Sequence, residues 1–263
     1  MLLSDVDAYL ARIGLDRAAT LTTLHRAHVT SIAFENFDPL AGRRVSLAIA
    51  DIEHKMVAAR RGGYCFEHNL LFLAAVTTLG LGRSQMLLAR VRRGDETLAH
   101  LLTHLCLRID DERGSWLCDV GFGGGSLLEP VPFKTGTEVD QSGWRFRLVG
   151  DGDEVVLQAF EDAQWADNYS FSPTPAAMSD VEASNLFTSS DPRSPFVLGL
   201  FVAARREDRE LTMFIRDRPV MFDRSVAGPS VETEIELDDI PRVLAERFSI
   251  FGVRVLSDGR VTL

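Results

Sequence analysis

The most informative stretch of this chain is Arg60-Arg61-Gly62-Gly63-Tyr64-Cys65-Phe66-Glu67-His68-Asn69. A glycine-rich turn here leads into residues 66–79, which lack proline and glycine and carry apolar residues at helical spacing. The pattern predicts a helix with Gly80 as its C-cap and with Cys65 in its first turn. Unpaired N–H groups and the helix dipole at that turn favour an anion, so Cys65 is a candidate nucleophile. The alternative is that Cys65 is a small, buried apolar residue.

The composition is that of a globular chain. Of 263 residues, 46% are hydrophobic and 25% are charged, which allows one large domain or several smaller ones around a shared core. The net charge of −10 disfavours a nucleic-acid partner.

The cysteine count indicates the compartment. Cys65, Cys106 and Cys118 are an odd number in a long chain without zinc-site spacing, which predicts a cytoplasmic protein with neither a disulfide framework nor a bound metal. The N-terminal residues lack the basic and apolar regions of a signal peptide. No run of about 18 apolar residues predicts a membrane span.

The expected secondary structure changes along the chain from helices to strands. Helices are expected first, at 6–13 with Ser4 as N-cap, 21–32, 51–61 and 66–79, with 34–39 as a loop. Short β-rich runs separated by turn residues follow at 86–91, 98–109, 116–120, 144–149 and 155–160. Residues 170–185 resemble a linker, and a last unit has expected strands at 197–203 and 211–215 and a helix at 239–248.

An activated cysteine requires a base, and the base requires a group that orients it. His68 lies one helical turn after Cys65, but an i+3 neighbour usually points along the helix surface. His100 and His104 both lie in the expected strand 98–109.

Pairing between strands separates these two histidines. If 110–113 form the hairpin loop and Ile109 faces Gly114, His104 lies opposite Asp119. Side chains opposed in this way are within hydrogen-bond reach, whereas His100 would face Phe122 and Gly123 and find no carboxylate. Asp119 would then fix the imidazole tautomer, and a buried carboxylate in an apolar strand needs such a partner.

A glycine-rich run, residues 121–126, follows Asp119 directly. Such a loop lets a ligand approach backbone N–H groups and is able to form an anion nest. It lacks the strand–GxGxxG–helix context of a dinucleotide fingerprint, so a flexible turn is an equal interpretation.

Several motifs, in order along nearly the whole chain, resemble the arylamine N-acetyltransferase family. They are Phe34-Glu35-Asn36, Arg61-Gly62-Gly63-Tyr64-Cys65 with Asn69, Thr103-His104-Leu105, Cys118-Asp119-Val120-Gly121-Phe122-Gly123 and Ser194-Pro195-Phe196. The resemblance implies an α+β fold with a cysteine-proteinase-like core. Its parts would be an N-terminal helical bundle at 1–85, a central antiparallel β-barrel with a linker at 86–185, and an α/β lid at 186–263 that is shortened at its C-terminus.

The resemblance also implies the chemistry. An acyl group would pass from acetyl-CoA, or another acyl thioester, through a Cys–His–Asp triad to an arylamine or hydrazine, with no permanently bound cofactor. The triad residues would be Cys65, His104 and Asp119. Phe34, Tyr64, Phe122 and Phe196 would bind the acceptor, and Thr103, Gly123 and Gly124 would contact the cofactor.

Other functions remain open from the sequence. The short C-terminus favours the related amide synthases, which close polyketides into macrolactams and take their donor from an acyl carrier protein. With water as acceptor, the same triad would serve a cysteine hydrolase. A binding module in which Cys65 is inert is the non-enzymatic alternative. The sequence gives no oligomeric state.

Overall fold

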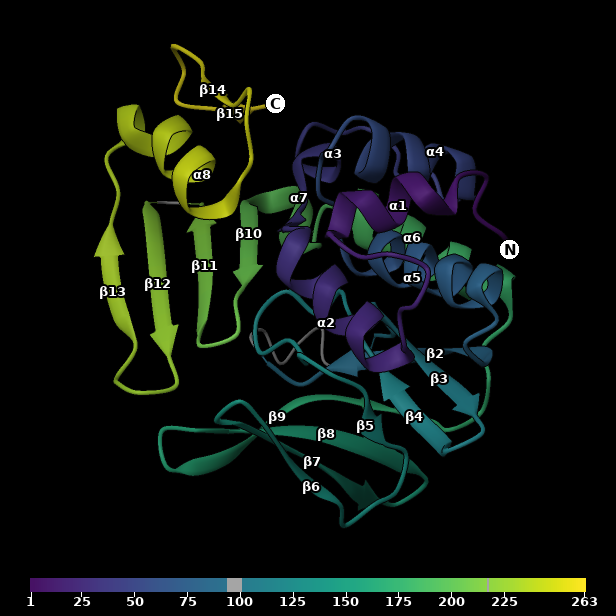
Figure 1. Cartoon of the computed structure of the whole chain (residues 1–263). Helices are drawn as coiled ribbons and strands as arrows, with labels where there is room; N and C mark the ends of the chain where they lie inside the picture. Colours follow the sequence, from purple (N-terminus) through teal and green to yellow (C-terminus); the bar gives the residue numbers. More distant parts are fainter. Residues whose placement is uncertain (94–100, 217) are drawn as a thin grey trace.

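The structure, a computed structural model, describes residues 1–93, 101–216 and 218–263. Its N-terminal part is mainly helical (Figure 1). The elements there are α1 Val6–Ile13, α2 Leu21–Ser31, β1 Phe34–Glu35, α3 Phe37–Leu40, α4 Ile49–Glu53, the π-helical turn η1 His54–Ala58 and α5 Cys65–Leu79. Helix α5 is buried continuously from Cys65 to Val76, because it is apolar around most of its circumference and other elements pack against every side.

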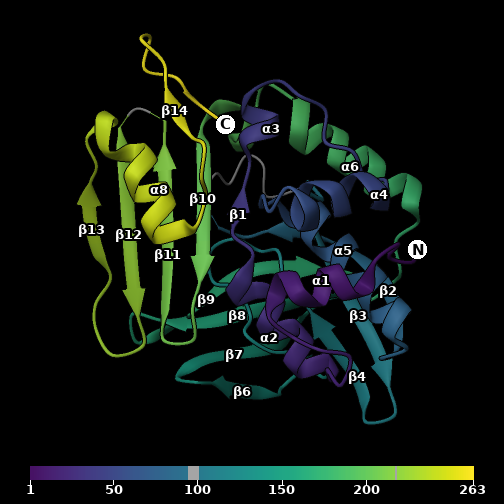
Figure 2. The ribbon, with the colours of Figure 1, turned by 45° about the horizontal axis from the view of Figure 1, so that its top comes forward.

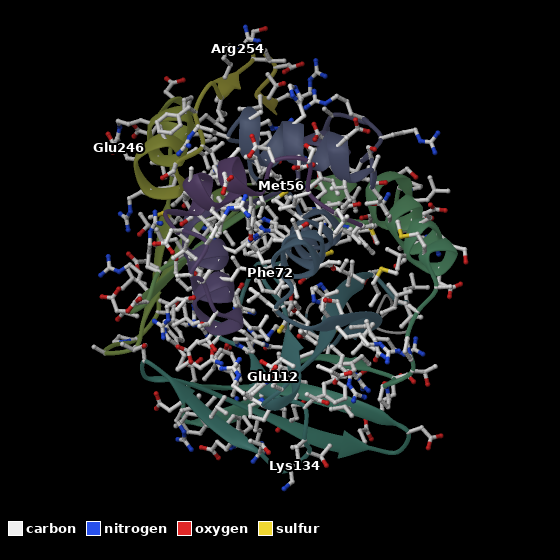
Figure 3. The ribbon with its side chains drawn as sticks, turned by 45° about the vertical axis from the view of Figure 1, so that its right-hand side comes forward. Met56, Phe72, Glu112, Lys134, Glu246 and Arg254 are labelled. Atoms are coloured by element: carbon white, nitrogen blue, oxygen red, sulfur yellow. The ribbon has the colours of Figure 1, made fainter. Side chains whose placement is uncertain are left out.

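Gly80 ends α5 in the left-handed conformation, as predicted. In the view of Figure 3, Met56 of η1 and Phe72 of α5 lie inside the molecule, and both are fully buried. Glu246 and Arg254 lie at its outer margin and are exposed.

The N-cap of α1 differs from the prediction. Asp5, rather than Ser4, caps the helix, and its side chain accepts the N–H of Ala8 at 2.9 Å. The N–H and hydroxyl of Ser4 instead donate to the carboxylate of Glu53, which lies far away in the sequence.

Two further local predictions for this part are wrong. Residues 34–39 are not a loop, because Phe34–Glu35 pairs with a strand near the C-terminus and Phe37–Leu40 forms a helical turn. The helix expected at 51–61 begins at Ile49, changes into the π-helical turn and ends at Ala58. A partner distant in the sequence decides the first case, so local propensity was a poor guide.

The Gly62-Gly63 turn lies directly against β1. The N–H of Glu35 donates to the Gly63 carbonyl at 2.8 Å, and Phe34 and Gly63 form a parallel bridge. A Cβ atom at residue 62 would lie only 2.2 Å from the Ala33 carbonyl oxygen. Close backbone approach therefore explains the glycine at this position.

The middle of the chain forms an eight-stranded antiparallel sheet that curves into a nearly closed barrel, as predicted (Figure 1). Its spatial order is β5-β4-β3-β2-β9-β8-β7-β6. The strands are β2 Arg83–Val91, β3 His104–Asp111, β4 Gly114–Cys118, β5 Val131–Pro132, β6 Glu138–Gln141, β7 Trp144–Asp151, β8 Glu154–Glu161 and β9 Gln164–Phe171. The part of the expected strand 98–109 before residue 101 lies outside the described residues.

The β3–β4 register differs from the predicted one by two residues. Gly114 pairs with Asp111 rather than with Ile109, so the turn consists of Glu112 and Arg113 alone. The Asp111 carboxylate accepts the N–H groups of Arg113 and Gly114 and thereby closes this tighter turn.

Residues 170–185 are not a linker. Strand β9 continues to Phe171, and helix α6 spans Met178–Ser190. The buried face of α6 carries mostly small polar residues, which a sequence pattern does not distinguish from a loop; they are Val181, Ser184, Asn185, Thr188 and Ser189.

A five-stranded antiparallel sheet of order β1-β10-β11-β12-β13 completes the fold. Helix α8 packs on one of its faces (Figure 2). The remaining elements are α7 Pro195–Leu198, β10 Leu200–Arg205, β11 Arg209–Ile215, β12 Pro219–Ser225, β13 Val231–Glu234, η3 Leu237–Asp239, α8 Ile240–Phe248, β14 Arg254–Val255 and β15 Val261–Thr262. The strand expected at 197–203 thus begins later, because Pro195 starts a helical turn. The α+β class is confirmed, and the division at residues 85 and 185 stays a prediction.

Replacing Gly62 by alanine should destabilise the protein. The new methyl group would meet the Ala33 carbonyl at 2.2 Å, so backbone has to move, and we expect a loss of roughly 2 kcal/mol or more in urea unfolding. The matched control is Gly150→Ala, because Gly150 lies in a strand with no neighbouring atom within 4 Å of the new methyl group. Equal midpoints for both variants would contradict the close approach.

Candidate active site

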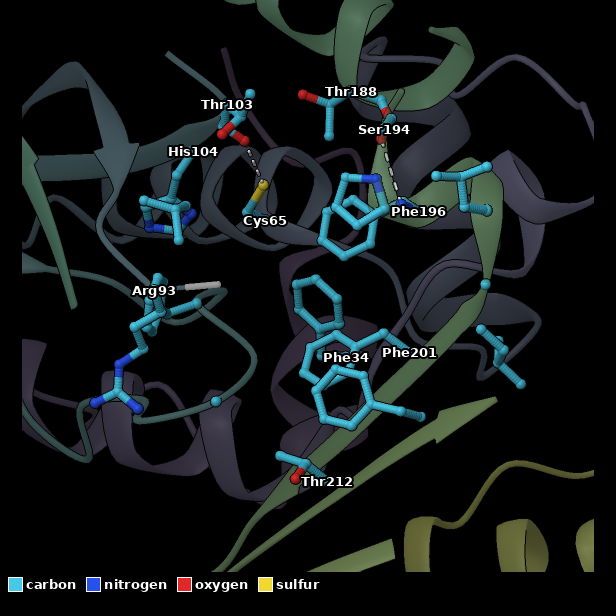
Figure 4. A pocket seen from close by; sticks show the side chains of 18 of the residues that line it. Phe34, Cys65, Arg93, Thr103, His104, Thr188, Ser194, Phe196, Phe201 and Thr212 are labelled. Carbon is cyan, nitrogen blue, oxygen red and sulfur yellow. Dashed lines mark hydrogen bonds between the residues drawn. The ribbon is translucent and has the colours of Figure 1, made fainter. Parts of the chain in front are cut away.

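Cys65 is the first residue of α5, and its thiol faces a cavity (Figure 4). Tyr64 precedes it in extended conformation as the N-cap residue. The Sγ atom lies 3.7 Å from the carbonyl oxygen of Thr103, on the approach to β3. Only 3% of Cys65 is exposed, so the thiol is reached through the cavity and not from the outer surface.

His104 and Asp119 form a buried pair beside it. The Nε2 atom of His104 lies 2.7 Å from Oδ2 of Asp119, and their exposed fractions are 2% and 0%. Asp119 follows the end of β4, and in the extrapolated register it faces Cys106 rather than His104. The two side chains still meet, because residues offset by two on one face of a sheet are diagonal neighbours.

The pair determines the protonation of His104. Burial alone would lower the pKa of the imidazole, but the charge of Asp119 and its hydrogen bond outweigh burial and raise this pKa to about 10. The neighbouring Cys65 side chain contributes to this rise. Burial likewise opposes ionisation of Asp119, yet His104 holds the pKa of the Asp119 carboxyl below its ordinary value. At neutral pH the pair is therefore imidazolium and carboxylate, and the imidazolium also forms a hydrogen bond with the side chain of Cys65.

Asn69 braces this arrangement, although the sequence motif gave it no role. Its Nδ2 lies 3.0 Å from Oδ1 of Asp119 and 2.7 Å from the Leu105 carbonyl. Its Oδ1 accepts the N–H of Val120. Asn69 is one helical turn beyond Cys65, so the helix that carries this thiol also holds the carboxylate of Asp119. The spacing of Cys65 and Asn69 was the signal available in the sequence.

The first glycine of the 121–126 run lies against Cys65. A Cβ atom at Gly121 would be 3.0 Å from Cα of Cys65 and 2.8 Å from Cβ of His68. The N–H of Gly121 also donates to Asp119 at 3.0 Å. The run thus begins with a close backbone contact, and the first turn of α5 can approach it only because residue 121 has no side chain.

The cavity measures about 650 Å³ and brings together most of the predicted site residues. Those that line it are Cys65, His104, Thr103, Gly124, Phe34, Phe122 and Phe196. Asp119 lies behind His104. Tyr64 and Gly123 are not among the described residues of the lining, and the hydroxyl of Tyr64 instead donates to Asn185 beneath the cavity.

The wall facing Cys65 is aromatic (Figure 4). Phe34 packs against two other rings, with its centroid 5.7 Å from that of Phe196 and 5.3 Å from that of Phe201. The ring of Phe122 meets His104 edge-on at 5.2 Å. Sequence analysis missed Phe201, Phe214 and Phe222 of the C-terminal sheet, which also line the cavity.

His68, the histidine one helical turn after Cys65, has other partners. Nδ1 of His68 bonds to His28 and its Nε2 to the Ala33 carbonyl, and burial lowers its pKa to about 4. His100 lies outside the described residues. Cys106 and Cys118 are free and fully buried, and burial raises the pKa of each thiol.

Within the described ranges, no group of three or more metal-ligating side chains is close enough to hold a metal ion. None of the helices in those ranges has both the length and the apolar character that a membrane crossing requires.

The chain is similar to known proteins over nearly its whole length. A family model described as N-acetyltransferase matches residues 18–254. The arylamine N-acetyltransferase of Mycolicibacterium smegmatis is 35% identical over 259 residues, which are 95% of this chain and 92% of the relative. A Salmonella typhimurium protein described as arylamine N-acetyltransferase / N-hydroxyarylamine O-acetyltransferase is 32% identical over 267 residues, with 97% and 92% covered.

Solved structures agree with these relatives. Mycobacterium marinum arylamine N-acetyltransferase in complex with CoA has a TM-score of 0.85 and 33% identity, with 94% of this chain and 93% of that chain covered. The Salmonella typhimurium enzyme has a TM-score of 0.83 and 29% identity, with 99% and 96% covered.

Replacing Asp119 by asparagine should remove a pH-dependent part of the stability. Because the pKa of His104 is raised in the folded state, the ion pair contributes fully to folding stability below pH 6.5, the ordinary pKa of histidine. This contribution is lost as the pH rises through about 10. We therefore expect Asp119→Asn to lower the free energy of unfolding by roughly 3 kcal/mol near pH 6, and the difference from the unsubstituted protein to shrink towards pH 10.

Asp110→Asn is the control, because Asp110 is paired with Arg108 at the partly exposed end of β3. Its effect should be smaller and should not vary over that range, since arginine keeps its charge. A difference for Asp119→Asn that stays constant from about pH 6 to pH 10 would contradict the assigned ion pair.

Proposed function

This chain belongs to the arylamine N-acetyltransferase family, and on that premise we propose that it transfers an acetyl group from acetyl-CoA through Cys65 to an arylamine or hydrazine nitrogen. The chain is an acetyltransferase, and its family uses acetyl-CoA as co-substrate. One observation supports the route through Cys65 most strongly: its thiol opens into the same cavity as an imidazole that a buried carboxylate keeps protonated.

In the first half of the reaction, the Cys65 thiolate attacks the thioester carbonyl. A bond forms between Sγ and the acyl carbon, the bond from that carbon to the CoA sulfur breaks, and His104 gives its proton to the departing thiolate. Exchange of one thioester for another is nearly isoenergetic, so the acyl-enzyme stores the reactivity of the donor.

In the second half, the amine nitrogen attacks the acyl carbon. The new C–N bond replaces the C–S bond to Cys65, and the neutral imidazole of His104 takes the proton of the amine. The thiolate–imidazolium pair is thereby restored. Asp119 keeps the ring in the tautomer and orientation that both transfers require.

The cavity suggests where the two substrates lie. Thr103, whose carbonyl oxygen lies 3.7 Å from the thiol, and Gly124 both line it, and we assign them to the thioester. Phe34, Phe122 and Phe196 are assigned to the acceptor ring, because aromatic walls bind flat apolar molecules by stacking and edge contacts. Tyr64, which is buried against Asn185, is assigned to holding the first turn of α5 in place.

The acyl-enzyme provides the direct test. Adding acetyl-CoA without amine should add the mass of one acetyl group to the intact protein, and Cys65→Ala should abolish both this adduct and turnover. Cys106→Ala is the matched control and should keep the adduct, because that thiol is buried away from the cavity. Normal turnover by Cys65→Ala would overturn the mechanism.

The size of the cavity keeps the amide synthase as a second candidate. A cavity of about 150 Å³ holds a benzene ring, so 650 Å³ accommodates acyl groups and acceptors larger than one ring. For such an enzyme the donor would be a polyketide thioester on an acyl carrier protein.

A donor screen distinguishes the candidates. The acetyltransferase should acylate Cys65 with acetyl-CoA at a kcat/KM at least about tenfold above that for bulky acyl thioesters, and the amide synthase should show the reverse order. The lifetime of the acyl-enzyme in amine-free buffer tests the remaining alternative, a cysteine hydrolase. Loss within the turnover time would identify a hydrolase, whereas persistence supports a transferase.

A further inference from the structure

His25 is a fully buried residue of α2 that the mechanism above does not use. Its ring has two polar partners, both in the backbone. Nδ1 lies 3.1 Å from the carbonyl oxygen of Leu128, and the N–H of Asp119 points at Nε2 at 3.1 Å. The ring also meets Phe72 of α5 edge-on at 5.5 Å, which fixes its plane between the two helices.

The partners of His25 determine its tautomer. A backbone carbonyl only accepts, so Nδ1 carries the proton, and a backbone N–H only donates, so Nε2 offers its lone pair. A second proton, on Nε2, would place two hydrogen-bond donors against each other, because the N–H of Asp119 already points at that atom. Burial lowers the pKa of His25 to about 4, and the nearby carboxylates of Asp119 and Glu129 offset this effect only in part. The ring therefore stays neutral at physiological pH.

The N–H of Asp119, which donates to His25, lies just beyond the end of the sheet ladder. The β3–β4 ladder ends at the pair Leu107–Cys118, one residue before Asp119. Beyond that point the chain enters the glycine-rich segment, which reaches Leu128 before β5 begins. One imidazole thus joins both ends of residues 119–128.

This segment supplies two parts of the candidate site. At its first residue, Asp119 presents its carboxylate to His104. In its middle, Phe122, Gly124 and Gly125 line the cavity. A segment so rich in glycine has a large conformational entropy in isolation, so its shape depends on contacts with the rest of the protein. Glu210 accepts the N–H groups of Gly125 and Ser126 in its middle, and His25 holds its two ends.

We propose that His25 is a positioning residue that clamps residues 119 and 128 together, and so holds the Asp119 carboxylate against His104 and keeps the cavity wall in place. The inference deepens the proposed function and rests on it for the role of Asp119. His25 acts through the backbone and does not line the cavity among the described residues.

The test compares variants of the full chain. His25→Leu removes both hydrogen bonds at similar volume, and His25→Gln offers one donor and one acceptor in their place. His28→Leu is the matched control, because His28 lies on the same helix with the same burial and bonds to Tyr9 and His68 instead of Asp119. Should His25→Leu fail to fold, His25→Asn replaces it, since its shorter amide reaches Leu128 and not Asp119.

The main readout is the titration of the His104 ring by ¹⁵N NMR, with its signal identified by its loss in His104→Asn. The titratable groups that face this ring in the described part of the chain are Asp119, Cys65 and Tyr169. We expect His25→Leu to lower the pKa of His104 by about one unit, the size of losing much of one charge-assisted hydrogen bond. His25→Gln should restore the pKa of His104. His28→Leu should lower the melting temperature and leave the pKa of His104 unchanged.

Turnover provides the second readout. We expect kcat of His25→Leu to fall about tenfold with little change in the KM of the acceptor. The substitution should disturb the orientation of His104 and leave binding of the acceptor unchanged. An unshifted His104 titration in His25→Leu, with only stability lost, would reduce His25 to a structural role and overturn the inference. If the unsubstituted protein transferred no acyl group, the proposed function would fail, while the NMR titration would still decide whether His25 positions Asp119.

Discussion

The buried contact between His104 and Asp119 is the constraint on which the rest of the structure depends. Removing two ions from water costs several kcal/mol each, and their attraction compensates only when the remaining hydrogen-bonding capacity is also satisfied. Here the carboxylate receives Nδ2 of Asn69 and the N–H of Gly121 besides the imidazole. These donors come from α5, β3 and the glycine-rich segment, so satisfying one carboxylate fixes how three elements lie around the thiol.

Much of this site was predictable from the sequence, because its signals are local. The glycine turn, the apolar run and Gly80 define α5 and the place of Cys65 upon it. The encounter of His104 with Asp119 was predicted from a register that proved wrong by two residues. The prediction survived because side chains reach diagonally across a ladder as well as directly, and only a slip by an odd number would have turned one of them to the other face.

The remainder depends on partners that a linear pattern does not contain. Phe34–Glu35 is extended because β10 pairs with it, and α6 is a helix although its buried face carries serine, threonine and asparagine. Phe201 and Phe214 of the cavity wall belong to the C-terminal sheet, and no spacing in the sequence connects them with Cys65. Tyr64 shows the opposite case: it precedes Cys65 in the chain, yet its hydroxyl donates to Asn185, and it is not among the described residues that line the cavity.

The pairing of β1 with β10 also bears on synthesis. Phe34 lies opposite Ala203, and the backbone of this same early strand supports the turn that leads into Cys65. While the ribosome has not yet released residues 200–205, that strand has one unpaired edge and its contacts carry a large loop-closure cost. A nascent chain therefore completes the support beneath Cys65 only after residues 200–205 have left the ribosome, and a chaperone that shields the unpaired edge of β1 would act before that point.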